Sequence, residues 1–176
     1  RARSGLTIST RDGGPDGPRG CVRDLRLRWA CEEAGLAYTV RTVPFEDRAT
    51  NHLAQQPFGQ VPFLQDGSLE IFESGAGLLH LARKSEVLMP RDPAGEAETL
   101  QWTIAALNSI EMASVPWWFI GLSNPENNPL EGWLGQRLGH MERVLGEKPW
   151  LAAGRFTVAD LLMADVLRIP ALRKFG

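Results

Sequence analysis

The sequence predicts an α/β domain with the element order βαβ-ββα, followed by an all-α domain. Three observations predict this arrangement. Up to residue 84, short apolar runs typical of strands alternate with segments of helical periodicity. The pair Asp66-Gly67 separates two of these runs, and both residues tolerate the positive φ angles of a tight hairpin turn. Beyond residue 93 the apolar patterns are helical, so we expect two domains in the 176 residues.

Glycine and proline residues mark the boundaries of the elements in the first half. Gly35 stands where a helix commonly ends in the left-handed conformation. Pro62 opens a strand, a position at which a missing N–H is tolerated. The expected elements are a strand at 5–10, a Gly/Pro-rich loop at 11–20, a helix at 21–34, a strand at 38–43, a loop with a short helix at 45–54, strands at 61–65 and 69–72, and a helix from 73.

A change of composition separates the two halves of the chain. The segment 85–93, SEVLMPRDP, is the expected linker. Asp92 followed by Pro93 predicts a helix start, with the aspartate as N-cap and the proline in the first turn. This helix is expected to reach about Ala113, and Pro116 is expected to kink or end it.

Two further helices are expected before the end of the chain. One spans 130–145, and the other spans 158–167 and is apolar almost all round, which is typical of a buried central helix. Thr157 and Asp160 have the spacing of a capping box at the start of the second.

Composition and charge exclude several classes of function. The net charge of −2 argues against nucleic acid or an anionic membrane surface as the main partner. No apolar run is long enough to span a membrane, and no signal peptide is visible. Cys21 and Cys31 fall within one expected helix, too far apart to bond, so we expect thiols in a reducing cytoplasm.

The hairpin around Asp66-Gly67 ends in residues suited to a zwitterionic ligand. The Val61-Pro62 bond is a candidate cis peptide, which would leave the Val61 backbone free to bind a ligand. Ser74 can cap the following helix, whose first N–H groups favour a carboxylate. Glu73 can accept a hydrogen bond from an ammonium group. These features predict a site for an amino-acid head group.

Three motifs resemble the soluble glutathione S-transferases, in particular bacterial-type members. They are QPFGQVP, in which Gln56 replaces the family's usual Asn, then FESGAG, and RFTVADLLMADV in the second half. The resemblance implies a thioredoxin-like glutathione-binding domain at 1–84, the linker at 85–93, and a helical domain on the acceptor-substrate side at 94–176. Family members commonly continue for several tens of residues past the helix expected at 158–167, so we expect the helical domain to be incomplete.

The resemblance implies the residues that bind glutathione. They lie at the hairpin and at the helix start, and one is a cation for the glycine carboxylate: Gln60, Val61, Pro62, Glu73, Ser74 and Arg48. His52 is the second candidate for the cation, although a surface arginine or histidine is often only solvated.

The family stabilises the glutathione thiolate with a Tyr, Ser or Cys near the end of the first strand and the start of the first helix. Tyr38, the only tyrosine, lies in the second strand and is expected to be a packing residue. Ser9 and Thr10 end the first strand, while Cys21, counted back from Gly35, falls near the family's serine position. A thiol at a helix N-terminus between arginines would also have a lowered pKa. All three remain candidates.

Trp117 and Trp118 are candidates to line the pocket for a hydrophobic electrophile, with core packing as the alternative. The expected function is conjugation of glutathione to this electrophile by a homodimer, with no metal and neither nucleic acid nor membrane as partner. Two alternatives share the fold. One is a glutathione-dependent thiol–disulfide oxidoreductase or isomerase, and the other is a non-catalytic binding module.

Overall fold

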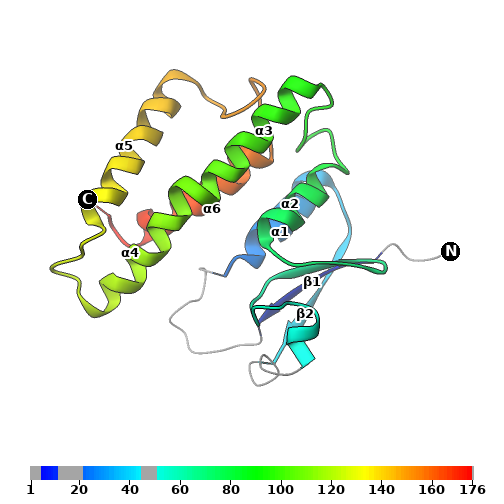
Figure 1. Ribbon diagram of the computed structural model, residues 1–176. Helices are drawn as coiled ribbons and strands as arrows, with labels where there is room; N and C mark the ends of the chain where they lie inside the picture. The colour runs from blue at the N-terminus through cyan, green and yellow to red at the C-terminus, as the bar shows by residue number, and fades with distance from the viewer. Residues whose placement is uncertain (1–4, 12–21, 45–50, 176) are drawn as a thin grey trace. The chain divides into compact units, whose positions relative to one another are not determined.

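The computed structural model describes residues 5–11, 22–44 and 51–175, which form two compact units (Figure 1). The first unit comprises Arg1–Glu86 and the second Val87–Gly176. The division falls inside the segment 85–93. Part of that segment packs within the second unit, because Leu88 is fully buried and its carbonyl accepts a hydrogen bond of 2.9 Å from the N–H of Val158.

The first unit is built on a four-stranded mixed sheet with the strand order β2-β1-β3-β4. Strand β1 (Leu6–Arg11) pairs in parallel with β2 (Tyr38–Val43) and antiparallel with β3 (Phe63–Asp66). Strand β4 (Leu69–Ile71) completes the hairpin with β3. This order confirms the expected βαβ-ββα fold.

Two helices, α1 (Asp24–Ala34) and α2 (Ser74–Ala82), cover one face of this sheet side by side (Figure 1). Ile8 and Leu64 are paired neighbours on that face, and both are fully buried. Gly77 allows the close approach, since a Cβ there would lie 3.0 Å from Leu27 of α1 and 3.7 Å from Leu64. On the opposite face, His52 of the short helix η2 (Asn51–Ala54) contacts the ring of Phe63, with the ring centroids 5.3 Å apart.

Several expected boundaries in this unit are wrong by one to three residues. Helix α1 begins at Asp24 rather than at 21, with Gly35 ending it at a φ of 63°. Strand β3 begins at Phe63, after the Val61-Pro62 peptide bond, which is cis. Because proline has no N–H to donate to the ladder, pairing starts only beyond it. Strand β4 ends at Ile71, one residue before Phe72.

The second unit consists of helices only among its described elements. A continuous helical rod contains α3 (Pro93–Ala105), the π-helical segment η3 (Ala106–Glu111) and α4 (Met112–Ser123). Helix α6 (Val158–Leu172) packs along all three parts of the rod, and α5 (Glu131–Glu147) packs against η3 and α4. Figure 1 shows the rod in green with α6, in orange to red, beside it.

Pro116 was expected to end or kink the first long helix, and the expectation that it ends the helix is wrong. Pro116 lies inside α4, and the helical rod continues to Ser123. A proline removes the bond to the carbonyl four residues earlier, here that of Met112. Immediately before Met112 the helix widens into the π-segment, so the irregularity falls one turn upstream.

Helix α6 begins with the expected capping box but is longer than 158–167. The Thr157 side chain accepts from the Ala159 N–H at 3.2 Å, and Asp160 accepts from the Thr157 N–H at 2.9 Å. Pro170 lies inside the helix near its end. None of the helices in the described parts of the chain is long and apolar enough to cross a membrane.

Candidate functional site

The register of the sheet brings three segments to the same edge. Leu64 pairs with Ile71, and continuing that register by two residues sets Pro62 opposite Glu73. On the other side of β3, Ser9 pairs with Phe63, and one step further sets Thr10 opposite Pro62. The end of β1, the cis proline and the start of α2 therefore meet at one end of the sheet.

The loop before Pro62 is held by two buried side chains. Gln56 accepts hydrogen bonds through Oε1 from the N–H of Phe58 at 2.6 Å and from that of Gln60 at 3.2 Å. His52 contacts the Gln60 carbonyl through Nε2 at 2.6 Å. Val61 is half-buried, and its backbone has no hydrogen-bond partner among the described residues. The loop thus presents the Val61 amide at the edge of the sheet.

The role predicted for Ser74 as the helix cap is wrong. The cap position is occupied by Glu73, which has a φ of 67° and makes no side-chain cap bond. Ser74 is the first helical residue, and its Oγ accepts a hydrogen bond of 3.1 Å from Nη1 of Arg26 in α1. Positive φ at a non-glycine residue is uncommon and concentrates at functional sites. The turn leaves the Glu73 side chain exposed.

The start of α2 is electropositive for two reasons. The first N–H groups of the helix carry the positive end of its dipole. The guanidinium of Arg26, only 2% exposed, lies beside Ser74. A carboxylate is therefore favoured at this helix start, while the exposed carboxylate of Glu73 next to it favours an ammonium group.

The two hydroxyls at the end of β1 lie on opposite faces of the sheet. Ser9 points away from α1 and α2, is fully buried, and accepts a hydrogen bond of 3.2 Å from Nη2 of Arg41. Arg41 also lies over the ring of Phe63 at 5.5 Å. Thr10 faces the side of the helices and is half-buried. Its hydroxyl, unlike that of Ser9, belongs to a side chain with exposed surface.

Two predicted site residues, Cys21 and Arg48, lie outside the described residues. Helix α1 begins at Asp24, three positions after Cys21 in the sequence. The other cysteine, Cys31, is a free thiol with no exposed surface. Burial, followed by the negative charge of Glu32, raises the pKa of Cys31 to about 11. Cys31 is therefore a structural, unreactive thiol at neutral pH.

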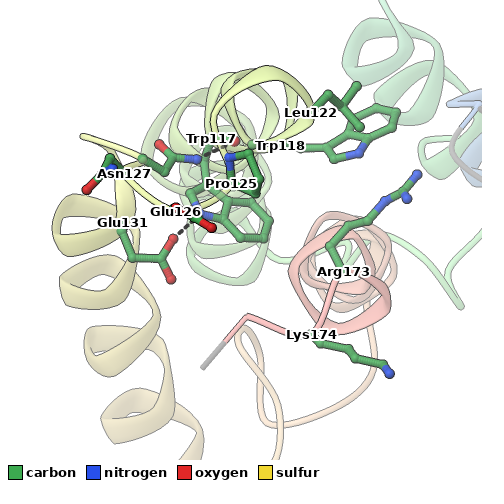
Figure 2. Close-up of a pocket in the computed structure, with 11 residues that line it drawn as sticks. Trp117, Trp118, Leu122, Pro125, Glu126, Asn127, Glu131, Arg173 and Lys174 are labelled. Carbon is green, nitrogen blue, oxygen red and sulfur yellow. Dashed lines mark hydrogen bonds between the residues drawn. The ribbon is translucent and has the colours of Figure 1, made fainter.

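The helical unit contains a cavity of about 640 Å³ that is lined by both predicted tryptophans (Figure 2). Trp117 is nearly buried, stacks edge-on against Phe175 at 5.3 Å, and donates through Nε1 to the carboxylate of Glu131. Trp118 is half-buried and carries the guanidinium of Arg173 over its ring at 4.8 Å. Trp117 therefore packs in the core and also lines the cavity.

Three residues organise the site in ways that the sequence alone does not predict. Arg26 has the pattern of a solvated helix residue, and its contact with Ser74 spans 48 positions, so no local signal reveals it. Gln56 stands where the family usually has Asn, and its longer side chain bonds two backbone N–H groups of the loop. His52 is a sequence candidate for a ligand carboxylate, but its ring contacts the Gln60 carbonyl.

Comparison with known proteins gives consistent matches across the chain. Residues 17–83 match the family described as glutathione S-transferase, N-terminal domain. Probable glutathione S-transferase GSTF2 of rice is 34% identical over 145 residues, which cover 74% of this chain and 67% of the rice protein. Glutathione S-transferase 1 of maize is 41% identical over 98 residues, covering 48% of this chain and 45% of the maize protein.

A solved structure supports the same relationship. The theta class glutathione S-transferase of Xanthomonas axonopodis pv. citri, with glutathione bound, is 28% identical and superposes with a TM-score of 0.76, covering 97% of this chain and 84% of that protein. The chain thus spans less than half of the maize relative's length and about two thirds of the rice relative's.

Proposed function

The chain belongs to the glutathione S-transferase family, and from this premise we propose that it binds glutathione and conjugates its thiolate to an electrophilic small molecule. The observation that carries the proposal is the convergence of Thr10, the cis Val61-Pro62 bond and the start of α2 at one edge of the sheet. A nucleophilic thiolate needs a group that stabilises it and neighbours that hold the rest of the peptide.

The start of α2 is the proposed site of the γ-glutamyl head group. Its α-carboxylate would accept hydrogen bonds from the Ser74 hydroxyl and the first N–H groups of α2, next to the buried charge of Arg26. Its ammonium group would donate to Glu73. The Val61 backbone, without a partner among the described residues, would pair with the peptide backbone of glutathione. Gln60 and Pro62 shape this segment, and Arg48 is proposed for the glycine carboxylate.

The thiolate stabiliser is proposed to be Thr10 or Cys21. Thr10 has exposed surface on the side of α1 and α2, at the edge where the proposed site lies. Ser9 is the weakest of the three candidates, because it is fully buried on the opposite face and already accepts a hydrogen bond from Arg41. A stabilising hydroxyl or thiol would donate to the sulfur, lower the pKa of the glutathione thiol and leave the thiolate free to attack.

A comparison of Ser9→Ala, Thr10→Val and Cys21→Ala tests this mechanism. The purified variants are measured for glutathione binding by calorimetry and for turnover of an aromatic chloride across the pH range. Loss of the stabilising donor is expected to reduce turnover about 100-fold and to raise the apparent pKa of turnover, with binding nearly unchanged. Ser9→Ala is expected to change neither quantity.

If none of the variants changes the pH profile, another residue stabilises the thiolate. Failure of the unmodified protein to bind glutathione would overturn the proposed function itself. The thiol–disulfide alternative predicts instead a mixed disulfide between Cys21 and glutathione, which mass spectrometry of the non-reduced protein would detect. Cys31 does not suit the role of a second redox cysteine, because its thiol is buried and has a raised pKa.

The proposal also covers the acceptor substrate, the oligomeric state and the cellular compartment. The cavity beside Trp117 and Trp118 is proposed to hold a hydrophobic electrophile, since its aromatic walls favour flat apolar molecules. The protein is proposed to work as a homodimer in the cytoplasm. The free thiol of Cys31 agrees with a reducing compartment.

A further inference from the structure

The end of α6 holds two cations at the cavity in an unusual backbone conformation. The N–H of Lys174 bonds the carbonyl of Ala171 at 3.2 Å, and the N–H of Phe175 bonds that of Pro170 at 3.0 Å. These two bonds form a Schellman motif, in which the left-handed position commonly belongs to glycine. Here Lys174 occupies it with a φ of 54°. A long charged side chain is thus present where glycine would be less strained.

Both cations line the cavity, but only Arg173 borders its aromatic wall. Arg173 lies over the ring of Trp118 at 4.8 Å, whereas the side chain of Lys174 extends away from Trp118 (Figure 2). Neither has a carboxylate partner among the described residues. The Schellman motif fixes the backbone of both residues, and the following residue, Phe175, packs against Trp117 at 5.3 Å.

The acidic residues of the cavity lie on a different wall. Glu131 at the start of α5 is already engaged, because its carboxylate accepts the hydrogen bond from Nε1 of Trp117. Glu126 lies in the exposed segment between α4 and α5. Figure 2 shows Glu131 and Arg173 on opposite sides of the cavity. The positive charge beside Trp118 therefore comes from Arg173, and Lys174 adds a second positive charge on the same side of the cavity, at the end of α6.

We propose that the cavity selects aromatic electrophiles that carry a negatively charged group, with the ring against Trp118 and the anionic group beside Arg173 and Lys174. This inference rests on the proposed function. In the reaction the glutathione sulfur forms a bond to the aromatic carbon, the carbon–halogen bond breaks, and the halide leaves with its electron pair. The thiol proton passes to solvent. The two cations bind and orient the substrate and take no part in bond making.

The test compares two electrophiles of the same shape, 4-chloro-3,5-dinitrobenzoate and the neutral 4-chloro-3,5-dinitrobenzamide. For each, kcat/KM is divided by the rate constant of the uncatalysed reaction with glutathione, and the ratio of benzoate to benzamide is the readout. The unmodified protein is expected to prefer the benzoate, and the preference should shrink as salt is raised. In the double variant Arg173→Gln/Lys174→Gly the ratio should fall about tenfold, as expected for two partly exposed charge pairs.

Three further measurements separate charge selection from damage to the fold. Lys174→Gly alone should lower the ratio while keeping or raising the melting temperature, because glycine suits the left-handed position. Glu126→Gln should raise the ratio, since it removes a repelling charge. Arg143→Gln, which removes an exposed charge of α5 outside the cavity, should leave the ratio unchanged.

The outcomes distinguish this inference from the proposed function. Turnover of the benzamide without a preference for the benzoate, or with a preference that the double variant retains, overturns the charge selection alone. Absence of turnover with either compound, together with absence of glutathione binding, overturns the proposed function.

Discussion

Two buried polar residues, Arg26 of α1 and Ser74 of α2, form a hydrogen bond at the start of α2. Arg26 is almost fully buried, and burying a guanidinium is unfavourable unless its donors are satisfied. Ser74 accepts one of these hydrogen bonds at 3.1 Å, so the hydroxyl is held in a fixed direction beside the first N–H groups of α2. The pair links α1 to α2 and keeps a positive charge near the site. One hydroxyl therefore serves both the fold and the proposed ligand.

At the level of this residue, Ser74→Ala is expected to weaken glutathione binding by about 1–2 kcal/mol, the contribution of a hydrogen bond to a charged group. Calorimetry gives the affinity, and the melting temperature reports the separate effect of leaving Arg26 without this partner. Ser68→Ala, an exposed serine in the turn of the same hairpin, is the matched control. Unchanged affinity in Ser74→Ala would remove α2 from the proposed binding site.

At the level of elements, one carboxylate joins the hairpin to α2. Asp66 at the end of β3 accepts from Nε2 of His80 at 2.8 Å and from Nζ of Lys84 at 2.7 Å. The hydrogen bond from Lys84, followed by that from His80, lowers the pKa of Asp66 below its usual value. The turn residue predicted only to reverse the chain thus also fixes the end of α2 against the sheet.

Replacing this carboxylate should make stability less dependent on pH. A carboxylate whose pKa is lowered by folding stabilises the protein above its unfolded pKa of about 3.9, and this contribution disappears as the pH falls through the lower folded value. Asp66→Asn should therefore lower the free energy of unfolding by about 1 kcal/mol at pH 7. Urea unfolding at several pH values should show the difference between the two proteins narrowing below about pH 4. A difference independent of pH would rule out the ionic contribution.

The elements differ in how far their sequences specify them. The Asp66-Gly67 turn, the end of α1 at Gly35 and the capping box at Thr157 are determined by neighbouring residues, and local patterns predicted all three. Pro116 does not end its helix, because packing between helices outweighs the lost hydrogen bond, and the sequence around Pro116 does not show that packing. The Ser74 contact was missed for a related reason, since its partner Arg26 is brought close only by the packing of α1 against α2.

For the whole molecule, each unit presents apolar side chains to solvent. In the first unit, Phe58 and Phe72 are 67% and 40% exposed and stack edge-on at 6.4 Å, next to the start of α2. In the second unit, Ile104 and Met112 on the helical rod are 50% and 46% exposed. Exposed apolar residues in groups are typical of surfaces that associate. We propose that these side chains contribute to the homodimer contact, supplied by the helix carrying Ser74 and His80 and the rod beginning after Asp92.

Ile104→Glu tests this assembly directly. A charge buried without a partner at an apolar interface is strongly unfavourable, so the dimer should dissociate about 100-fold more readily. Analytical ultracentrifugation over a range of micromolar concentrations gives the dissociation constant of the variant and of the unmodified chain. The exchange Gln136→Glu, at an exposed position of α5, adds the same charge and serves as the control. A monomer at micromolar concentration for the unmodified chain contradicts the proposed homodimer. If Ile104→Glu leaves the dimer intact, the interface does not lie on the rod at Ile104. An unpaired carboxylate buried in an apolar contact would weaken the dimer.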